Sequence, residues 1–380
     1  MAPNPFLGVA LHALGGLAAA SFYVPYRGVK QWAWEVYWLL GGVFSWIVAP
    51  WVLAALTAPH IFTILHAAPR SSILWAFLFG MMWGVGGLTF GLSMRYLGIA
   101  LGYAVALGFC AAFGTLVPPI FRGELLGLVS AAPGLTVLAG VGICLAGIAV
   151  SGAAGRSKER ELSLEERRAL IQEFDFTRGL LVAIFAGVLS ASMSYGIQAG
   201  KPIAAMAIKQ GTPPLWQNTP VFVVILAGGF VTNFLWCVAL ILRKGTWRSL
   251  AVPAPVGFRN AALCALAGTT WYAQFMFYGM GTTKMGRYDF SSWTLHMASI
   301  IIFSTLWGIA LREWRGTSRR THALIAAGLA TLILSTLVVG YGNYLEALRP
   351  AAGRASRSPT GKAAAILVLP AHAKQIVRSI

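Results

Sequence analysis

The sequence predicts an all-helical polytopic membrane protein with ten transmembrane helices, arranged as two inverted repeats of five helices each. Three observations support this class. Hydrophobic residues make up 57% of the 380 residues and charged residues only 11%, whereas a soluble domain carries about 25% charged residues. The hydrophobic runs have the length of helices that cross ~30 Å of hydrocarbon. Residue patterns also recur at a fixed spacing in the two halves of the chain.

Ten hydrophobic runs are candidate spans, and they cover residues 6–24, 37–56, 73–94, 98–118, 135–153, 179–199, 218–242, 261–281, 289–311 and 321–341. No Lys or Arg precedes the first run, so we expect a permanent span rather than a cleaved signal peptide. The expected organisation is a first five-helix repeat at 1–154, a charged cytoplasmic linker at 155–178, a second repeat at 179–344 and a tail at 345–380. We expect the linker to form a solvated amphipathic helix and the tail to be disordered or surface-bound.

The basic residues predict the orientation of the chain. The net charge is +18, and the odd-numbered connections between spans hold 17 Lys and Arg against 6 in the even-numbered ones. The positive-inside rule places the odd connections in the cytoplasm and the N-terminus outside, although the basic tail favours the opposite side.

The sequence has no polar domain that carries a basic stripe, so nucleic-acid binding is excluded. The four cysteines are scattered through apolar runs, which is typical of packing residues and not of a metal site.

The internal repeat is seen when the sequence is shifted by 188 residues. This shift aligns Gly80 with Gly268 and Trp83 with Trp271. It also aligns Gly91 with Gly279, Gly98 with Gly286, Gly140 with Gly328 and Gly152 with Gly340. Two halves of five spans must insert with opposite topology, which makes the repeat an inverted one. The alternative is that glycine-rich helix packing is simply similar in both halves.

The run that starts near Asp289 carries two ionisable residues. Asp289 and His296 are seven residues apart, so on one continuous helix they share a face, with Ser292 and Trp293 between them. Ionisable groups inside a span are candidates for function. We predict that Asp289 carries a coupling proton and that His296 relays or orients it. The alternative is a helix cap at Asp289 and a neutral packing histidine at His296.

The eighth run presents an indole, an amide and a phenol on one helical face, at Trp271, Gln274 and Tyr278. Aromatic faces stack on the C–H side of a pyranose and amides bind its hydroxyl groups. These residues, together with Trp83 and Trp293, are therefore predicted to bind a sugar, and the alternative is an aromatic packing stripe.

Further polar residues lie in or beside other runs. Gln198 is a candidate substrate contact, whereas Lys201 is interpreted as an interfacial anchor. Glu35 is a weaker candidate for function, and His12 and Asn233 are interpreted as residues that pack or bind neighbouring helices. No ATP-binding loop, catalytic grouping, metal site or cofactor motif is present in the sequence.

Several segments resemble the L-rhamnose–proton symporter family, a branch of the drug/metabolite transporter superfamily. They are residues 22–30, 32–35, 79–86, 91–98, 114–119, 271–275 and 288–297. The resemblance covers roughly residues 6–345. It implies ten helices and uptake of L-rhamnose, or a related 6-deoxyhexose, together with a proton across a bacterial inner membrane.

The expected function is therefore secondary active transport by a non-enzymatic protein whose partners are a sugar, a proton and the lipid bilayer. Two alternatives are open: an exporter or exchanger of small metabolites within the same superfamily, or a membrane sugar receptor that does not transport. The absence of a large soluble signalling domain argues against the receptor. An enzyme acting on lipid-linked sugars would need more polar residues in a cytoplasmic site.

Overall fold

The computed structural model describes residues 3–97, 99–162 and 175–349, and within these ranges the chain is helical without strands. Nine helical segments of this described part are long and apolar enough to cross a membrane. The predicted all-helical membrane class is thereby confirmed. A further helix, α15, has 29 residues and would extend about 44 Å. It is not among the nine segments because its Trp, Tyr, Gln and Thr residues lower its mean hydropathy.

Each long helix or helix pair overlaps one of the predicted runs, with ends that differ by up to eight residues. They are α1 (Pro5–Ser21), α3 (Trp34–Val43) with α4 (Ala49–Thr57), α6 (Arg70–Leu97), α7 (Ile99–Phe121), α9 (Ala132–Glu161), α11 (Phe176–Ser190) with α12 (Ser192–Ala199), α14 (Thr219–Lys244), α15 (Ala254–Thr282), α16 (Ser292–Ala310) and α17 (Arg319–Ala347). Short helices α2 (Tyr23–Tyr26), α5 (Ile61–Ala67), α8 (Leu125–Val129) and α13 (Lys201–Lys209) lie between them.

Three of the predicted boundaries fall inside helices. The expected linker at 155–178 begins inside α9, which continues to Glu161, and ends inside α11, which begins at Phe176 after its cap Asp175. Residues 163–174, on which the predicted amphipathic helix falls, lie outside the described residues. The tail 345–380 begins inside α17, and only its first residues, to Arg349, are described.

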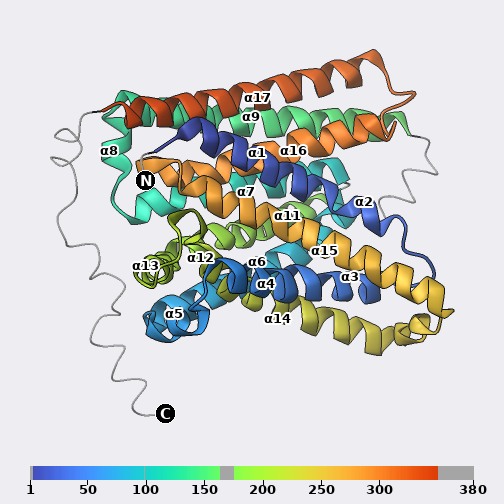
Figure 1. Ribbon diagram of the computed structural model, residues 1–380. Coiled ribbons are helices and arrows are strands. Elements are labelled where there is room, and N and C mark those ends of the chain that lie inside the picture. The colour runs from blue at the N-terminus through green and yellow to red at the C-terminus, as the bar shows by residue number, and fades with distance from the viewer. Residues whose placement is uncertain (1–2, 98, 163–174, 350–380) are drawn as a thin grey trace, which may run out of the picture.

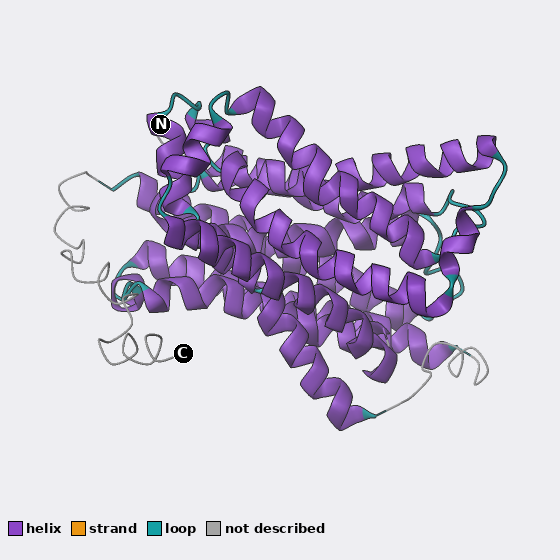
Figure 2. Cartoon of the chain, turned by 90° about the horizontal axis from the view of Figure 1, so that it is seen from below, coloured by secondary structure: helices purple, strands orange, loops and turns teal. Residues whose placement is uncertain are grey.

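The helices pack as pairs and small groups, some antiparallel, such as α9 with α17, and some parallel, such as α6 with α14. Helix α17 lies along α9, α6 packs against α11 and α14, and α1 packs against α15 and α16 (Figure 1). The same arrangement, seen along a perpendicular direction, is a single bundle of helices (Figure 2). Glycines allow the closest approaches: a side chain at Gly80 would collide with the carbonyl of Ile225, and one at Gly268 would collide with the carbonyl of Gly41.

The connections between long helices gather at two opposite ends of the bundle. The N-terminus lies at the same end as α5, α8 and α13 (Figure 1), and the backbone N–H of Asn4 donates to the carbonyl of Lys284 at 3.0 Å. We call this the N-terminal end. Helix α2 and the connection between α16 and α17 lie at the opposite end.

Candidate functional site

A polar pair lies between α15 and α16 and is buried. His296 Nε2 lies 3.3 Å from Gln274 Oε1, and the two side chains are 1% and 5% exposed. The amide Nε2 of Gln274 donates to the carbonyl of Trp271 at 3.0 Å, which turns Oε1 toward the imidazole. Because an amide oxygen only accepts, the hydrogen of a neutral His296 lies on Nε2. The other ring nitrogen, Nδ1, is then a lone-pair acceptor, and it has no partner.

Two histidines lie on either side of Tyr278. The ring of Tyr278 contacts those of His12 and His296 edge-on, at 5.2 Å each. His12 is fully buried, and neither of its ring nitrogens has a hydrogen-bond partner. The His12 ring packs against the backbone at Gly281, where a Cβ would lie 2.8 Å from its Cε1. Unpartnered polar atoms in a buried site are costly, by about 1–3 kcal/mol each, and ordered water or a polar ligand can satisfy them.

Aromatic rings extend this group toward the opposite end of the bundle. Trp83 on α6 and Trp271 on α15 are 5.7 Å apart, and Trp46 contacts Trp271 at 5.5 Å. Trp46 belongs to a π-helical turn at Phe44–Val48, a distortion that often marks functional sites. Its indole N–H is buried and unpartnered. A small cavity of about 10 Å³, enough for about one water molecule, adjoins these rings, and it is lined by Phe22, Tyr26, Trp38, Gly42, Ser45, Trp46, Gly268 and Trp271.

We call these residues the central cluster: His12, Trp46, Trp83, Trp271, Gln274, Tyr278, Trp293 and His296. Trp293 belongs to it through its ring contact with Tyr278 at 5.8 Å. Its indole N–H donates to the carbonyl of Cys110 at 3.1 Å, which fixes the ring between α7 and α16. The structure thus brings together five predicted sugar-site residues and His296.

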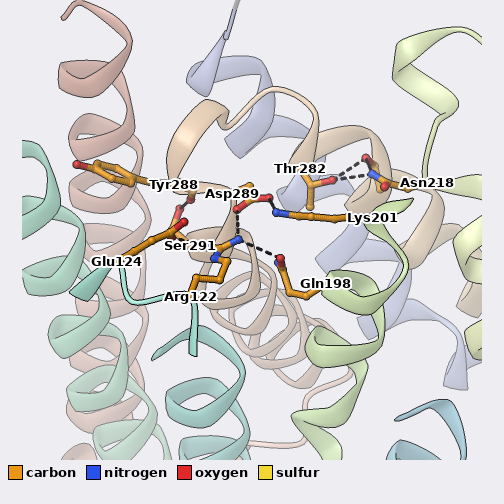
Figure 3. A network of polar contacts seen from close by, with 10 residues as sticks. Arg122, Glu124, Gln198, Lys201, Asn218, Thr282, Tyr288, Asp289 and Ser291 are labelled. Carbon is orange, nitrogen blue, oxygen red and sulfur yellow. Dashed lines mark hydrogen bonds and ion pairs between the residues drawn. The ribbon is translucent and has the colours of Figure 1, made fainter. Parts of the chain in front are cut away.

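A second polar group, the ion-pair network, lies at the N-terminal end (Figure 3). Asp289 Oδ2 lies 2.7 Å from Lys201 Nζ, and Asp289 Oδ1 lies 3.7 Å from Arg122 Nη1. Arg122 also donates to Gln198 Oε1 at 3.0 Å and lies 3.0 Å from Glu124 Oε2. These residues come from the turn between α7 and α8, from α12 and α13, and from the turn before α16. The network therefore ties four segments together at this end.

The predicted common face of Asp289 and His296 is wrong. Helix α16 begins at Ser292, and Asp289 lies in a 3-10 turn at Gly286–Ser291 in which Tyr288 has non-helical dihedral angles. Asp289 consequently faces Lys201 and Arg122, whereas His296 faces Gln274. Ser292, expected between them, is buried with an unpartnered hydroxyl group. Lys201, interpreted as an interfacial anchor, is an ion-pair partner of Asp289.

The remaining candidate residues from the sequence have hydrogen-bond or ion-pair partners outside the central cluster. Gln198 lies in the ion-pair network and not in the central cluster. Glu35 accepts from Thr246 at 2.9 Å and lies 3.6 Å from Lys244. Asn233 donates to the carbonyl of Gly229 in its own helix. All four cysteines are buried and unpaired, as predicted for packing residues, and no metal-binding group of His, Cys, Asp and Glu occurs among the described residues.

Sequence reasoning missed His12, Trp46 and Arg122 as site residues. His12 is a lone histidine in an apolar run, and a single histidine carries no spacing signal. Trp46 lies among fourteen tryptophans, and Arg122 follows α7 where an interfacial anchor is equally expected. Only the intramembrane position of His12 could have identified it in advance.

A bundle of membrane-crossing helices with a buried, partly unpartnered polar cluster and an ion-pair network at one end is the arrangement of a secondary transporter. The comparisons agree with this class. Residues 1–344 match the family model described as L-rhamnose-proton symport protein. The L-rhamnose-proton symporters of Cronobacter sakazakii and Salmonella paratyphi B are each 36% identical over 343 residues, which cover 88% of this chain and 97% of the relative. The symporter of Salmonella newport matches to the same extent.

The chain belongs to the L-rhamnose–proton symporter family. It is a multi-pass protein of the inner membrane. The relatives just described are named as transporters, and not as enzymes or receptors.

Proposed function

We propose that this protein imports L-rhamnose, or a close 6-deoxyhexose, by proton symport, with the central cluster as the sugar site. The observation that carries the proposal is the group of unpartnered buried polar atoms on His12, Trp46 and His296 beside aromatic rings in mutual contact. Sugar hydroxyl groups can donate to His296 Nδ1 and accept from the Trp46 indole, while Trp83 and Trp271 cover the C–H face of the ring.

The experiment that tests this function is counterflow in proteoliposomes. Vesicles loaded with unlabelled L-rhamnose should take up labelled L-rhamnose, and an inward pH gradient should drive accumulation without a sugar gradient. Uptake that does not respond to the pH gradient, or exchange of unrelated metabolites only, would contradict the symport assignment and favour an exchanger.

We also propose that ten helices cross the membrane, with α15 as the eighth, and that residues 1–154 and 179–344 are inverted repeats. Reciprocal contacts between α9 and α17 support the repeat. Gly140 packs against Val339 and Gly328 packs against Ser151, and the 188-residue shift relates the first pair to the second. Gly80 and Gly268, which the same shift aligns, both approach the backbone of a helix in the other half, α14 and α3 respectively.

Cysteine labelling tests the opposite topology of the two halves. His66 and Ala254 are 188 residues apart, and both are exposed next to the start of corresponding helices, α6 and α15. A membrane-impermeant maleimide should label His66→Cys from the periplasm and Ala254→Cys only in inverted vesicles. The four native cysteines are buried, so the parent protein should not be labelled and serves as the negative control. Labelling of both positions from the same side would contradict the inverted repeat.

Replacement of His12 separates a binding role from a packing role. His12→Leu keeps the volume of the side chain and removes two unpartnered buried nitrogens, so the melting temperature should not fall. If His12 contacts the sugar, binding measured by calorimetry should weaken by roughly 5-fold to 100-fold. A variant that melts lower and binds sugar normally would show that His12 only packs.

We further propose that Asp289 carries the coupling proton. By the positive-inside rule, the ion-pair network lies at the periplasmic end. Protonation of Asp289 would neutralise the carboxylate that holds Lys201 and Arg122, and so weaken the closure of this end. His296, which has a free lone pair on Nδ1 beside the sugar site, would relay or stabilise the proton. Proton binding at the ion-pair network and sugar binding at the central cluster would then be coupled.

A further inference from the structure

A second cavity lies at the end opposite the N-terminal end, outside the central cluster. It has a volume of about 610 Å³ and lies between the end of α16, the following connection and the first turns of α17. Ile309, Ile325 and Leu329 form its apolar wall, while Arg312, Arg315 and His322 supply its polar groups. The lining residues of α17 run from His322 to Leu329, seven residues that extend about 10 Å along the helix. The cavity thus combines basic groups of the connection and of the start of α17 with apolar groups of α16 and α17.

The basic groups of this cavity lack acidic partners in the described part of the chain. Glu313 is the acidic residue of the connection, and it pairs with Arg27 at 2.6 Å. Arg312 and Arg315 are exposed and make no ion pair among the described residues. Two uncompensated guanidinium groups beside an apolar wall favour a ligand that is anionic at one end and apolar at the other.

The backbone at Arg312 supports a role for its side chain. Arg312 has a φ of 58°, in the left-handed region, just after the end of α16. Glycine is usual at this position, because an L side chain is strained there. The other left-handed residue of the same connection is a glycine, Gly316. An arginine where glycine would be unstrained is the kind of outlier that points to a functional side chain.

Two further polar groups border the cavity. The indole N–H of Trp314 is buried and has no acceptor, and Lys158 of α9 lies over the same ring at 4.8 Å. His322 Nδ1 lies 3.0 Å from the carbonyl of Ser318. Because a carbonyl only accepts, Nδ1 carries a hydrogen, and Nε2 is the ring atom left to meet a ligand.

We propose that this cavity binds an anionic phospholipid of the cytoplasmic leaflet. The headgroup phosphate pairs with Arg312 and Arg315, and an acyl chain lies along Ile309, Ile325 and Leu329. The basic connection faces the leaflet that carries most anionic lipid, and each basic residue near such a surface favours binding. The inference concerns the outside of the bundle and does not depend on which solute the central cluster binds.

Native mass spectrometry of the full-length protein in detergent tests the proposal. Phosphatidylglycerol and phosphatidylcholine with identical acyl chains are titrated separately. The wild-type protein should bind phosphatidylglycerol in preference, and the double variant Arg312→Gln, Arg315→Gln should bind it roughly tenfold more weakly. The matched control is Arg319→Gln, Arg320→Gln, which removes two exposed arginines that do not line the cavity. It should stay within about twofold of the wild type.

A second variant tests whether the loss of lipid binding comes from the missing arginine side chain or from a disturbed fold of the connection. Arg312→Gly relieves the left-handed strain, so it should melt at a higher temperature and still lose preference for phosphatidylglycerol. Equal loss in the control pair, or an unchanged preference in Arg312→Gly, would overturn the site. Displacement of the lipid by soluble glycerol phosphate at equal concentration would also overturn it, because it would show that the apolar wall contributes nothing.

Discussion

Asp289→Asn should abolish sugar accumulation driven by a pH gradient while downhill exchange continues. With one proton per sugar, one pH unit supports about a tenfold sugar gradient, because it corresponds to about 1.4 kcal/mol. Asparagine cannot take up or release that proton, so the variant should reach only equal concentrations on both sides. Lys201 loses its ion-pair partner but is 47% exposed and can be hydrated, and Arg122 keeps Gln198 and Glu124, so the fold should persist. The measurement is labelled uptake in proteoliposomes with and without the gradient.

The matched control is Glu124→Gln, which removes the other carboxylate that lies beside Arg122. It should accumulate sugar, because Glu124 is not assigned a coupling role. Loss of both accumulation and exchange in Asp289→Asn would instead mean that the ion pair with Lys201 is needed for any conformational cycle. An Asp289→Asn protein that accumulates sugar against its gradient would exclude Asp289 as the proton carrier. The buried Glu35 would then be the next carboxylate to test.

Gln274→Ala should weaken sugar binding by roughly 5-fold to 150-fold, which corresponds to about 1–3 kcal/mol for a hydroxyl left unpaired in a buried site. The variant also removes the oxygen that orients His296, since His296 Nε2 lies 3.3 Å from Gln274 Oε1. The imidazole would then be free to turn, and its Nδ1 would no longer be held in one direction. Equilibrium binding by calorimetry measures the effect without the complication of transport rates.

Asn233→Ala is the control for Gln274→Ala. Asn233 is another buried intramembrane amide, but it donates to Gly229 of its own helix and not to the central cluster. Its removal should leave sugar affinity nearly unchanged. If both variants weaken binding equally, the effect is one of helix packing, and α15 would no longer be assigned to the sugar site.

Part of the proposed site could be grouped from the sequence, because three of its residues share one helix. Trp271, Gln274 and Tyr278 follow helical spacing on α15, and the structure gathers them with Trp83 and Trp293. The pairing of Lys201 with Asp289 could not be predicted, because the two residues lie on different elements and meet only through packing. The role of His12 could not be predicted either, because its neighbour Tyr278 is far away in the sequence.

The sequence by itself determined that the chain is a helical membrane protein, where its long helices lie, and that its two halves share a 188-residue pattern. These properties depend on the transfer of apolar runs from water to lipid, which each segment experiences alone. Only the tertiary structure decided that Asp289 and His296 belong to separate polar groups. A turn at Gly286–Ser291 interrupts the helical spacing, and the ion pairs that Asp289 forms in this turn come from other helices. Such contacts depend on how whole helices pack, and the spacing of residues along a single segment does not determine that packing.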